Sequence, residues 1–363
     1  MTGVHGWEQT RSRWLAWWKG EDIGRAGLWV TAPRESRTRS EPPPAPVDMQ
    51  RYWTDWDYWA RRIRWEHETT FYGGEAFPAW STGDPGHLTI AAYLGCPVTL
   101  DESTGWIEPI LTAESWDPEN LRIEEKNHWW QVALTRYERM ARECYSGPER
   151  TAGTLCVPHM GAFGGAGDTL SWIRGNERLL FDCVERPDLV RRTDMRLMEI
   201  WCRVFDRFYG MVAGDAGVTC YLPCWSPGKF FVTMCDFAYM ISPDMFKALF
   251  LPAIRVQTEF LDYSIHHVDG VGNFAHVPAL CDLPRLGAIQ ILPGAGQPSP
   301  LHWMELLKYV QSRGKNLWIG LEPQEVRHAL EELSSRGLMM QTHCATEEEA
   351  RRLVEQAGAW SHG

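Results

Sequence analysis

Apolar runs alternate regularly with amphipathic segments from about residue 151 to the C-terminus. Short runs rich in β-branched and aromatic residues predict strands at 154–158, 218–223, 230–235, 264–268, 288–292, 316–319 and 338–342. Apolar positions at helical spacing predict helices between most of these strands, at 168–182, 187–209, 243–263, 300–313, 323–334 and 346–357. Several of these helices begin at proline or just after Ser, Asp or Thr, as helix starts usually do. This alternation favours a mainly parallel sheet.

The first 150 residues follow a less regular pattern. The spacing of Trp7, Trp14, Leu15 and Trp18 predicts an amphipathic opening helix. A strand at 27–32 and a Trp-rich helix at 55–70 follow, separated by a Pro-, Arg- and Ser-rich stretch at 34–47 that is typical of an exposed loop. Gly and Pro then interrupt residues 71–127, where we expect a long irregular insertion.

Counting the first strand, eight strands are predicted, which is the number in a (β/α)8 barrel. We therefore expect an α/β fold, a (β/α)8 TIM barrel with an N-terminal helical extension and a long insertion before the second half. The alternative is an open doubly wound sheet, which would be favoured by a glycine-rich phosphate loop after a strand, but no segment has the dinucleotide-binding spacing. We interpret residues 1–363 as a single domain, with the helical extension, first strand and insertion in 1–150 and the regular repeats in 151–363.

Composition narrows the classes of partner. The formal charge of -11 and the lack of a long Lys or Arg run argue against nucleic acid. No stretch has the apolar length of a signal peptide or a membrane span. The ten cysteines are scattered, so we expect reduced thiols and a cytoplasmic protein. Most of the twenty tryptophans should serve packing, although some could line an aromatic ligand pocket.

The candidate chemistry lies at predicted strand ends, because the carboxyl ends of barrel strands share one mouth. His267 and Asp269 are two residues apart, so both side chains should lie on one face of their strand. Together with Cys344, after the last strand, they would form a mixed sulfur, nitrogen and oxygen ligand set that suits zinc. Asp236 is a candidate fourth ligand or proton-transfer group, and both Asp236 and Asp269 are candidate catalytic residues.

Structural roles compete with this interpretation. His267 could be a hydrogen-bonded core residue and Cys344 a small buried apolar one. His343 could replace Cys344 as a ligand, because adjacent strand residues face opposite ways and the register is not fixed. Asp168 could cap a helix, and Glu75 could face solvent. The residues we expect to contact a small-molecule substrate are Trp225, Tyr239, Gln290, Asp168, His159 and Glu75.

Several motifs resemble those of the uroporphyrinogen decarboxylase-like superfamily. They include Cys235-Asp236-Phe237, the segment 240–246, His267-Val268-Asp269-Gly270 and Pro293-Gly294-Ala295-Gly296. N-terminal matches are Tyr52-Trp53-Thr54-Asp55, the segment 73–78 and Asp168-Thr169-Leu170, so the resemblance covers nearly the whole chain. It implies a (β/α)8 barrel and one of two chemistries: decarboxylation of a porphyrinogen without a cofactor, or zinc-assisted methyl transfer between a cobamide and a thiol.

The resemblance favours methyl transfer. Decarboxylases of this superfamily carry an Arg-rich segment near the first strand, whereas the matching region here contains only Arg34. The methyltransferases hold zinc with a His-x-Cys and a later Cys; His267 and Cys344 match this set, but Asp269 stands in place of the first Cys. We therefore expect a zinc-dependent methyltransferase acting between a cobamide or methylated small molecule and a thiol-type acceptor. A metal-free decarboxylase or lyase and a non-catalytic binding protein are the alternatives.

The same resemblance suggests partners. The chain lacks an Asp-x-His-x-x-Gly segment of the corrinoid-carrier type, so a cobamide would arrive free or on a separate corrinoid protein. A second copy of the chain, in a homodimer, is a further candidate partner.

Overall fold

One seven-stranded sheet organises the molecule. The computed structural model describes residues 4–37, 40–84, 90–161, 163–165 and 167–361. Its main sheet has the strand order β2-β1-β11-β10-β9-β8-β7, and all neighbours are parallel except β1 and β2. The strands are β1 (Gly27–Pro33), β2 (Thr70–Gly74), β7 (Phe230–Met234), β8 (Tyr263–Asp269), β9 (Ala288–Leu292), β10 (Asn316–Gly320) and β11 (Leu338–His343).

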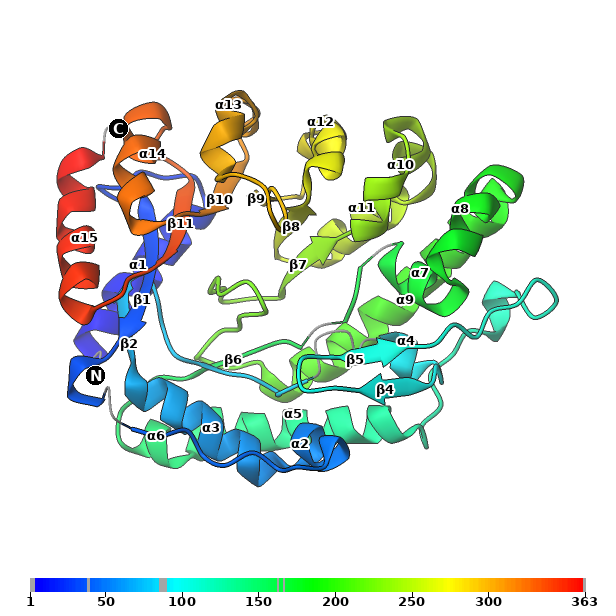
Figure 1. Ribbon diagram of the computed structural model, residues 1–363, viewed down its shortest axis with the longest axis horizontal. Coiled ribbons are helices and arrows are strands. Elements are labelled where there is room, and N and C mark those ends of the chain that lie inside the picture. The colour runs from blue at the N-terminus through cyan, green and yellow to red at the C-terminus, as the bar shows by residue number, and fades with distance from the viewer. Residues whose placement is uncertain (1–3, 38–39, 85–89, 162, 166, 362–363) are drawn as a thin grey trace.

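The strand order of this sheet differs from that of a doubly wound sheet. Strands β7 to β11 pair in sequence order, and β11 then pairs with β1, so the chain returns to its first strand without the reversal of a doubly wound sheet. In Figure 1 these strands form an arc, with α10 to α15 on its outer side and α3 and α5 across the molecule. The mixed α/β fold and most strands of the regular half are thus as predicted.

The expected closed barrel is not confirmed. Among the described residues, β3 (Ala79–Trp80) pairs only with β6 (Val157–Pro158), and β4 (Val98–Leu100) pairs with β5 (Gly105–Ile107). The predicted strand at 218–223 is reduced to single bridges, from Thr219 to His159 and from Val218 to Ser226. Pro78, Pro158 and Pro223 fall in these short segments, and proline cannot donate to a sheet ladder.

Helices of the regular half mostly follow the predicted ones. Two predicted helices are divided, one at Gly175, whose φ is 88°, and one just before Pro252. The helices are α7 (Asp168–Arg174), α8 (Asn176–Glu185), α9 (Pro187–Val212), α10 (Pro243–Leu249), α11 (Leu251–Phe260), α12 (Val277–Cys281), α13 (Met304–Ser312), α14 (Val326–Glu332) and α15 (Glu347–Trp360).

The first 150 residues are more helical than predicted. The first half contains α1 (Val4–Trp18), α2 (Met49–Thr54), α3 (Trp56–Thr69), α4 (Ile90–Tyr93), α5 (His128–Ser146) and α6 (Pro148–Thr151). The 19-residue α5 was not predicted, although Asn127 caps it by accepting a hydrogen bond from the Trp130 amide. Across the described residues, the helices are all too short or too polar to cross a membrane.

Helix α1 covers the amino ends of the main sheet. Trp14 stacks on Trp318 of β10, and Trp18 packs against Phe230 and Tyr263, the first residues of β7 and β8. The Asn316 amide side chain, at the start of β10, donates to the Trp17 carbonyl. With the amino ends covered in this way, the carboxyl ends of the strands are left to form a site.

Candidate metal centre

Three predicted site residues meet at the carboxyl ends of β7 and β8. One ligand atom from each of Asp236, His267 and Asp269 lies within 4.8 Å of the other two. Asp236 opens the 3-10 helix η3 (Asp236–Met240) two residues after β7, and His267 and Asp269 share one face of β8. The parallel pairing of Met234 with His267 brings the two strand ends together. His267 Nε2 lies 3.7 Å from Asp269 Oδ2.

The orientation of His267 is fixed by β9. Gln290 pairs with His267 across the sheet, and its Oε1 lies 2.6 Å from His267 Nδ1. Because the amide oxygen only accepts hydrogen bonds, Nδ1 carries the proton in the neutral ring, and Nε2 directs its lone pair toward the carboxylates. A histidine whose other nitrogen donates to a fixed oxygen is the usual arrangement of a metal-binding imidazole.

The negative charge of the group changes the titration of its neighbours. Burial disfavours the charged form of His267, but the Asp269 and Asp236 carboxylates outweigh it, so the pKa of His267 is raised. Asp168 is also buried, and its pKa is raised well above the usual range by desolvation and by the charge of Asp236. The Phe237 amide donates to Asp168 Oδ1 at 2.9 Å, so Asp168 lies behind the start of η3.

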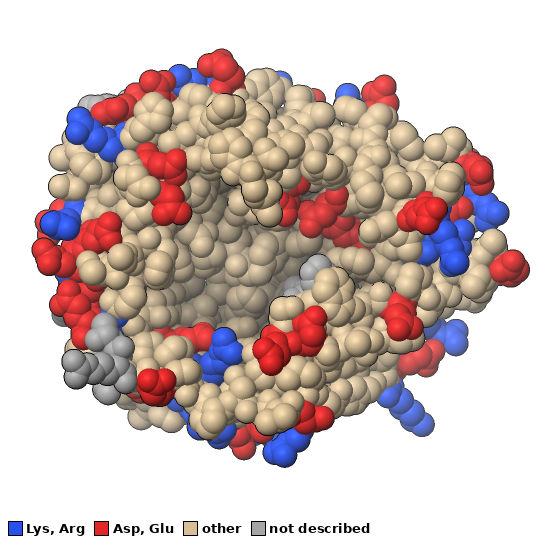
Figure 2. All heavy atoms as spheres, viewed as in Figure 1, with Lys and Arg blue, Asp and Glu red and all other residues tan. Residues whose placement is uncertain are grey.

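A cavity of about 640 Å³ adjoins the group. Gln290 lines it, as does Gly294, where a Cβ would lie 3.8 Å from Asp269 Oδ1. No Lys or Arg is found among the described residues around this cavity, whereas Glu322 and Glu325 are. The face seen in Figure 2 is hollowed near its centre, with acidic side chains at several points of the rim.

One buried polar atom at this cavity, Nε1 of Trp29 in β1, has no hydrogen-bond partner among the described residues. Because a buried donor without a partner is costly, this indole N–H is suited to bind an acceptor group of a ligand.

Cys344 does not join the group, which corrects the expected ligand set. Strands β9 and β10 separate β8 from β11, so the end of the last strand lies away from His267. The Cys344 side chain is buried, its amide donates to the Thr31 carbonyl, and burial raises the pKa of its thiol to about 11. The alternative ligand His343 is exposed and lines the cavity, where its Nδ1 lies 3.1 Å from Thr31 Oγ1.

Two of the expected substrate contacts are structural. Glu75 is buried and bound by Arg13, by Arg25 and by the Leu28 amide, so its carboxylate holds α1 and β1 together. Trp225 is fully buried, and its Nε1 donates to the Ala216 carbonyl at 2.7 Å. Sequence alone could not separate these residues from mouth residues. The Arg partners of Glu75 are distant in the chain, and nothing in the local sequence indicates the hydrogen bond from Trp225 to Ala216.

The remaining expected contacts differ in position. Gln290 and Asp168 lie beside the group, as described above. Tyr239 is 52% exposed, and its ring occupies the space that a Cβ on Gly270 or Gly272 would need, next to Asp269. His159 forms the bridge to Thr219, and burial lowers its pKa to about 4.

Tyr221 was missed by sequence reasoning. Its ring lies edge-on to His267, with centroids 6.0 Å apart and planes at 86°. The available signal was its position near the end of the predicted strand at 218–223, the same criterion that selected Asp236 and His267.

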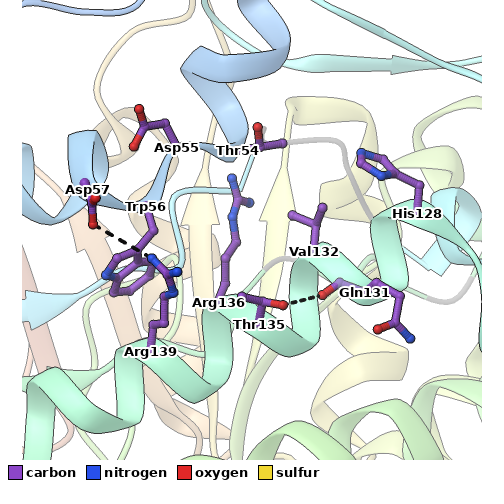
Figure 3. A pocket seen from close by; sticks show the side chains of 10 residues that line it. All are labelled: Thr54, Asp55, Trp56, Asp57, His128, Gln131, Val132, Thr135, Arg136 and Arg139. Atoms are coloured by element: carbon purple, nitrogen blue, oxygen red, sulfur yellow. Dashed lines mark hydrogen bonds and ion pairs between the residues drawn. The ribbon is translucent and has the colours of Figure 1, made fainter.

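A second cavity, of about 460 Å³, lies away from this centre and contains none of the predicted site residues. Figure 3 shows it between the α2–α3 corner and α5. Its cations are paired: Arg136 Nη1 lies 2.7 Å from Asp84 and Arg139 Nη1 lies 3.8 Å from Asp57. The chemistry of the molecule is therefore better sought at the carboxyl ends of the main sheet.

Comparison with known proteins finds a similarity in fold. No family model matches the chain, and no curated protein matches it in sequence. Among solved structures, the chain is similar to a methyltransferase from Methanosarcina mazei, with a TM-score of 0.59 and 13% identity. The match covers 96% of this chain and 98% of that one. The likeness shows a shared fold over nearly the full length.

Proposed function

We propose that the protein is a metal-dependent methyltransferase in which Asp236, His267 and Asp269 hold a divalent metal ion, with zinc as the first choice. The observation that carries the proposal is the meeting of these three donors within 4.8 Å, beside a cavity at the carboxyl ends of the strands. The choice of methyl transfer draws support from the fold shared with a methyltransferase, and from the superfamily resemblance.

The donor set fits such an ion. One imidazole nitrogen and two carboxylate oxygens are accepted zinc ligands, and three protein ligands leave a coordination position open. Without a thiolate the set is harder than the one first expected, so ions such as manganese are competitors. Zinc bound here would lower the pKa of a coordinated thiol and keep it nucleophilic at neutral pH.

The chain's own residues would position the reactants. Gln290 fixes the His267 ring, and Tyr221 covers one edge of it. Trp29 Nε1 would donate a hydrogen bond to a substrate in the cavity. The acceptor thiol would lose its proton to solvent, and its sulfur would form a bond to the methyl carbon. The bond from that carbon to the donor would break, and its electron pair would stay on the donor. The donor would be a cobamide, delivered free or by a corrinoid protein, or a methylated small molecule.

The charges of the site disfavour the alternative of a decarboxylase. A substrate with several carboxylates needs Arg or Lys partners, whereas the charged residues described around the site are acidic, including Glu322 and Glu325. A neutral or cationic methyl donor suits this electrostatic field better.

Metal analysis and turnover test the proposal. We expect His267→Ala to lose one equivalent of metal and to abolish methylation of a thiol, while Cys344→Ser keeps both. Gln290→Leu should lower metal affinity about 10- to 100-fold, because it removes the oxygen that orients His267. Gln341→Leu is the matched control: Gln341 Oε1 accepts from Trp318 Nε1 on the same sheet and does not contact His267.

Each other result has a definite meaning. Full metal content and activity in His267→Ala would overturn the proposal. Turnover of a carboxylated substrate that survives strong chelators would favour the decarboxylase or lyase. Ligand binding without turnover of any methyl donor or carboxylate would favour a binding protein.

A further inference from the structure

A second group of side chains that could bind a metal ion comes from residues far along the chain from Asp236, His267 and Asp269. His67 of α3, Glu149 of α6 and Cys156, directly before β6, each offer one donor atom within 4.8 Å of the others. The His67 and Glu149 side chains are 6% and 19% exposed, and Cys156 is fully buried. None of the three belongs to the elements that carry Asp236, His267 and Asp269.

The hydrogen bonds around His67 leave one nitrogen available. Nε2 lies 3.0 Å from the Ala79 carbonyl oxygen, which can only accept, so Nε2 carries the proton in the neutral ring. Nδ1 then presents a lone pair to Glu149 Oε1 at 2.9 Å. Two acceptors at this distance repel each other unless a positive species lies between them, either a second proton on the imidazole or a metal ion.

The other contacts resemble the support of a metal ligand. Trp80 Nε1 donates to Glu149 Oε2 at 2.9 Å and thereby fixes the carboxylate. Backbone and side-chain partners of this kind commonly orient metal-binding His and carboxylate groups.

The spacing of the donors agrees with zinc. Cys156 Sγ lies 4.0 Å from His67 Nδ1 and 3.5 Å from Glu149 Oε2. With metal–ligand bonds of about 2.0 to 2.3 Å, tetrahedral zinc places its donors roughly 3.2 to 3.7 Å apart. The observed separations of 2.9, 3.5 and 4.0 Å bracket that range, so small side-chain shifts would suffice.

The geometry points to a second metal site, in which His67 Nδ1, Glu149 and the Cys156 thiolate hold one zinc ion that joins α3, α6 and the start of β6. The thiol proton leaves as zinc binds, so the ion and its two anionic ligands have no net charge, which suits a buried location. Water would complete the fourth position. The role is structural, and it does not depend on the proposed methyltransferase activity.

Cobalt(II) substitution separates the two sites, because only this one contains sulfur. We expect the cobalt-loaded protein to show a near-ultraviolet sulfur-to-cobalt charge-transfer band. Cys156→Ser should lose the band and one equivalent of zinc. Cys144→Ser, a change at another buried cysteine, in α5, should keep both. His267→Ala should keep the band even while it loses the metal of the first site.

The opposing results are equally clear. Absence of the band from the wild-type protein, or its persistence in Cys156→Ser, would overturn this second site. If Cys156→Ser does not fold, the His267→Ala protein serves instead: a mercurial thiol reagent should release one zinc from it, and no release contradicts the site. Loss of the first-site metal alone affects only the proposed function.

Discussion

Asp194 is a buried residue of α9, and only one oxygen of its carboxyl group has a hydrogen-bond partner among the described residues. Its Oδ1 accepts a hydrogen bond from the Gly167 amide at 2.7 Å, while Oδ2 is buried with no partner among the described residues. Desolvation raises the pKa of Asp194 to about 7, from an ordinary value of 3.8. Folding therefore favours the protonated acid. The contribution of this group to the free energy of unfolding is fully present below the pKa of the unfolded state, and it is lost as the pH rises through the pKa of the folded state.

Asp194→Asn should relieve this cost, because the amide keeps an acceptor for Gly167 and cannot ionise. Relative to wild type, its stability gain should be about 2 to 3 kcal/mol larger at pH 8 than at pH 5, since each pKa unit corresponds to about 1.4 kcal/mol. Urea unfolding at the two pH values measures the difference. Asp188→Asn, at a 93% exposed side chain in the same helix, is the control and should show no such pH dependence. An equal gain at both values would show that Asp194 titrates normally.

At the scale of single elements, Glu75, directly after β2, links that strand to α1, to the segment before β1 and to β1 itself. Its carboxylate contacts Arg13 Nε at 2.6 Å, Arg25 Nη2 at 2.9 Å and the Leu28 amide at 2.7 Å. Glu75 is 1% exposed, so the two guanidinium groups depend on it for charge balance. Removing one partner of a buried ion pair is costly because the opposite charge stays buried.

Glu75→Gln should therefore lower the free energy of unfolding by about 3 to 5 kcal/mol. Denaturant unfolding followed by circular dichroism measures the loss. Glu66→Gln provides the comparison, because Glu66 is 45% exposed in its i,i+4 pair with Arg62 and should cost less than about 1 kcal/mol. Similar losses in the two variants would show that the Glu75 network contributes no more than a surface pair.

How far the sequence predicts each element depends on the range of the forces involved. Strands β8, β9 and β10 follow their predicted bounds closely, because short runs that contain β-branched or aromatic residues can be recognised without a distant partner. Helix α5 was missed because its apolar positions, including Trp130 and Tyr137, stand beside an irregular segment and pack on Phe208 of distant α9. Residues 154–158 and 218–223 were overestimated as strands, because Pro158 and Pro223 at their ends cannot donate to a sheet ladder.

At the scale of the whole molecule, the same distinction governs the site. The separation of His267 and Asp269 by two residues is a local property, and it placed both side chains on one face of β8. The position of Cys344, in contrast, depends on strand order. Strand β11 pairs with β1 and β10, so β10 and β9 stand between its end and β8. Glu75 was likewise assigned to the mouth because its partners Arg13 and Arg25 are distant in the chain. Trp225 was assigned there because nothing in the local sequence indicates its hydrogen bond to Ala216.

Helix α1 sets the polarity of the molecule, because it covers the amino ends and leaves the carboxyl ends for chemistry. Trp14 is fully buried, stacks on Trp318 with planes at 14°, and donates from Nε1 to the Glu75 carbonyl. Trp318 in turn donates to Gln341, a residue that lines the cavity at the other end. An aromatic layer thus connects the covering helix to the floor of the site.

Trp14→Ala should cost about 3 to 5 kcal/mol of unfolding free energy, because it removes a large buried ring and leaves a cavity between α1 and β10. If α1 is integral to the one core, circular dichroism and tryptophan fluorescence should still report a single coincident transition at lower urea concentration. Trp106→Ala, at a 56% exposed ring in β5, should shift the midpoint little. Two separated transitions in Trp14→Ala, or a midpoint equal to that of Trp106→Ala, would mean that α1 folds apart from the sheet and does not support the floor of the cavity.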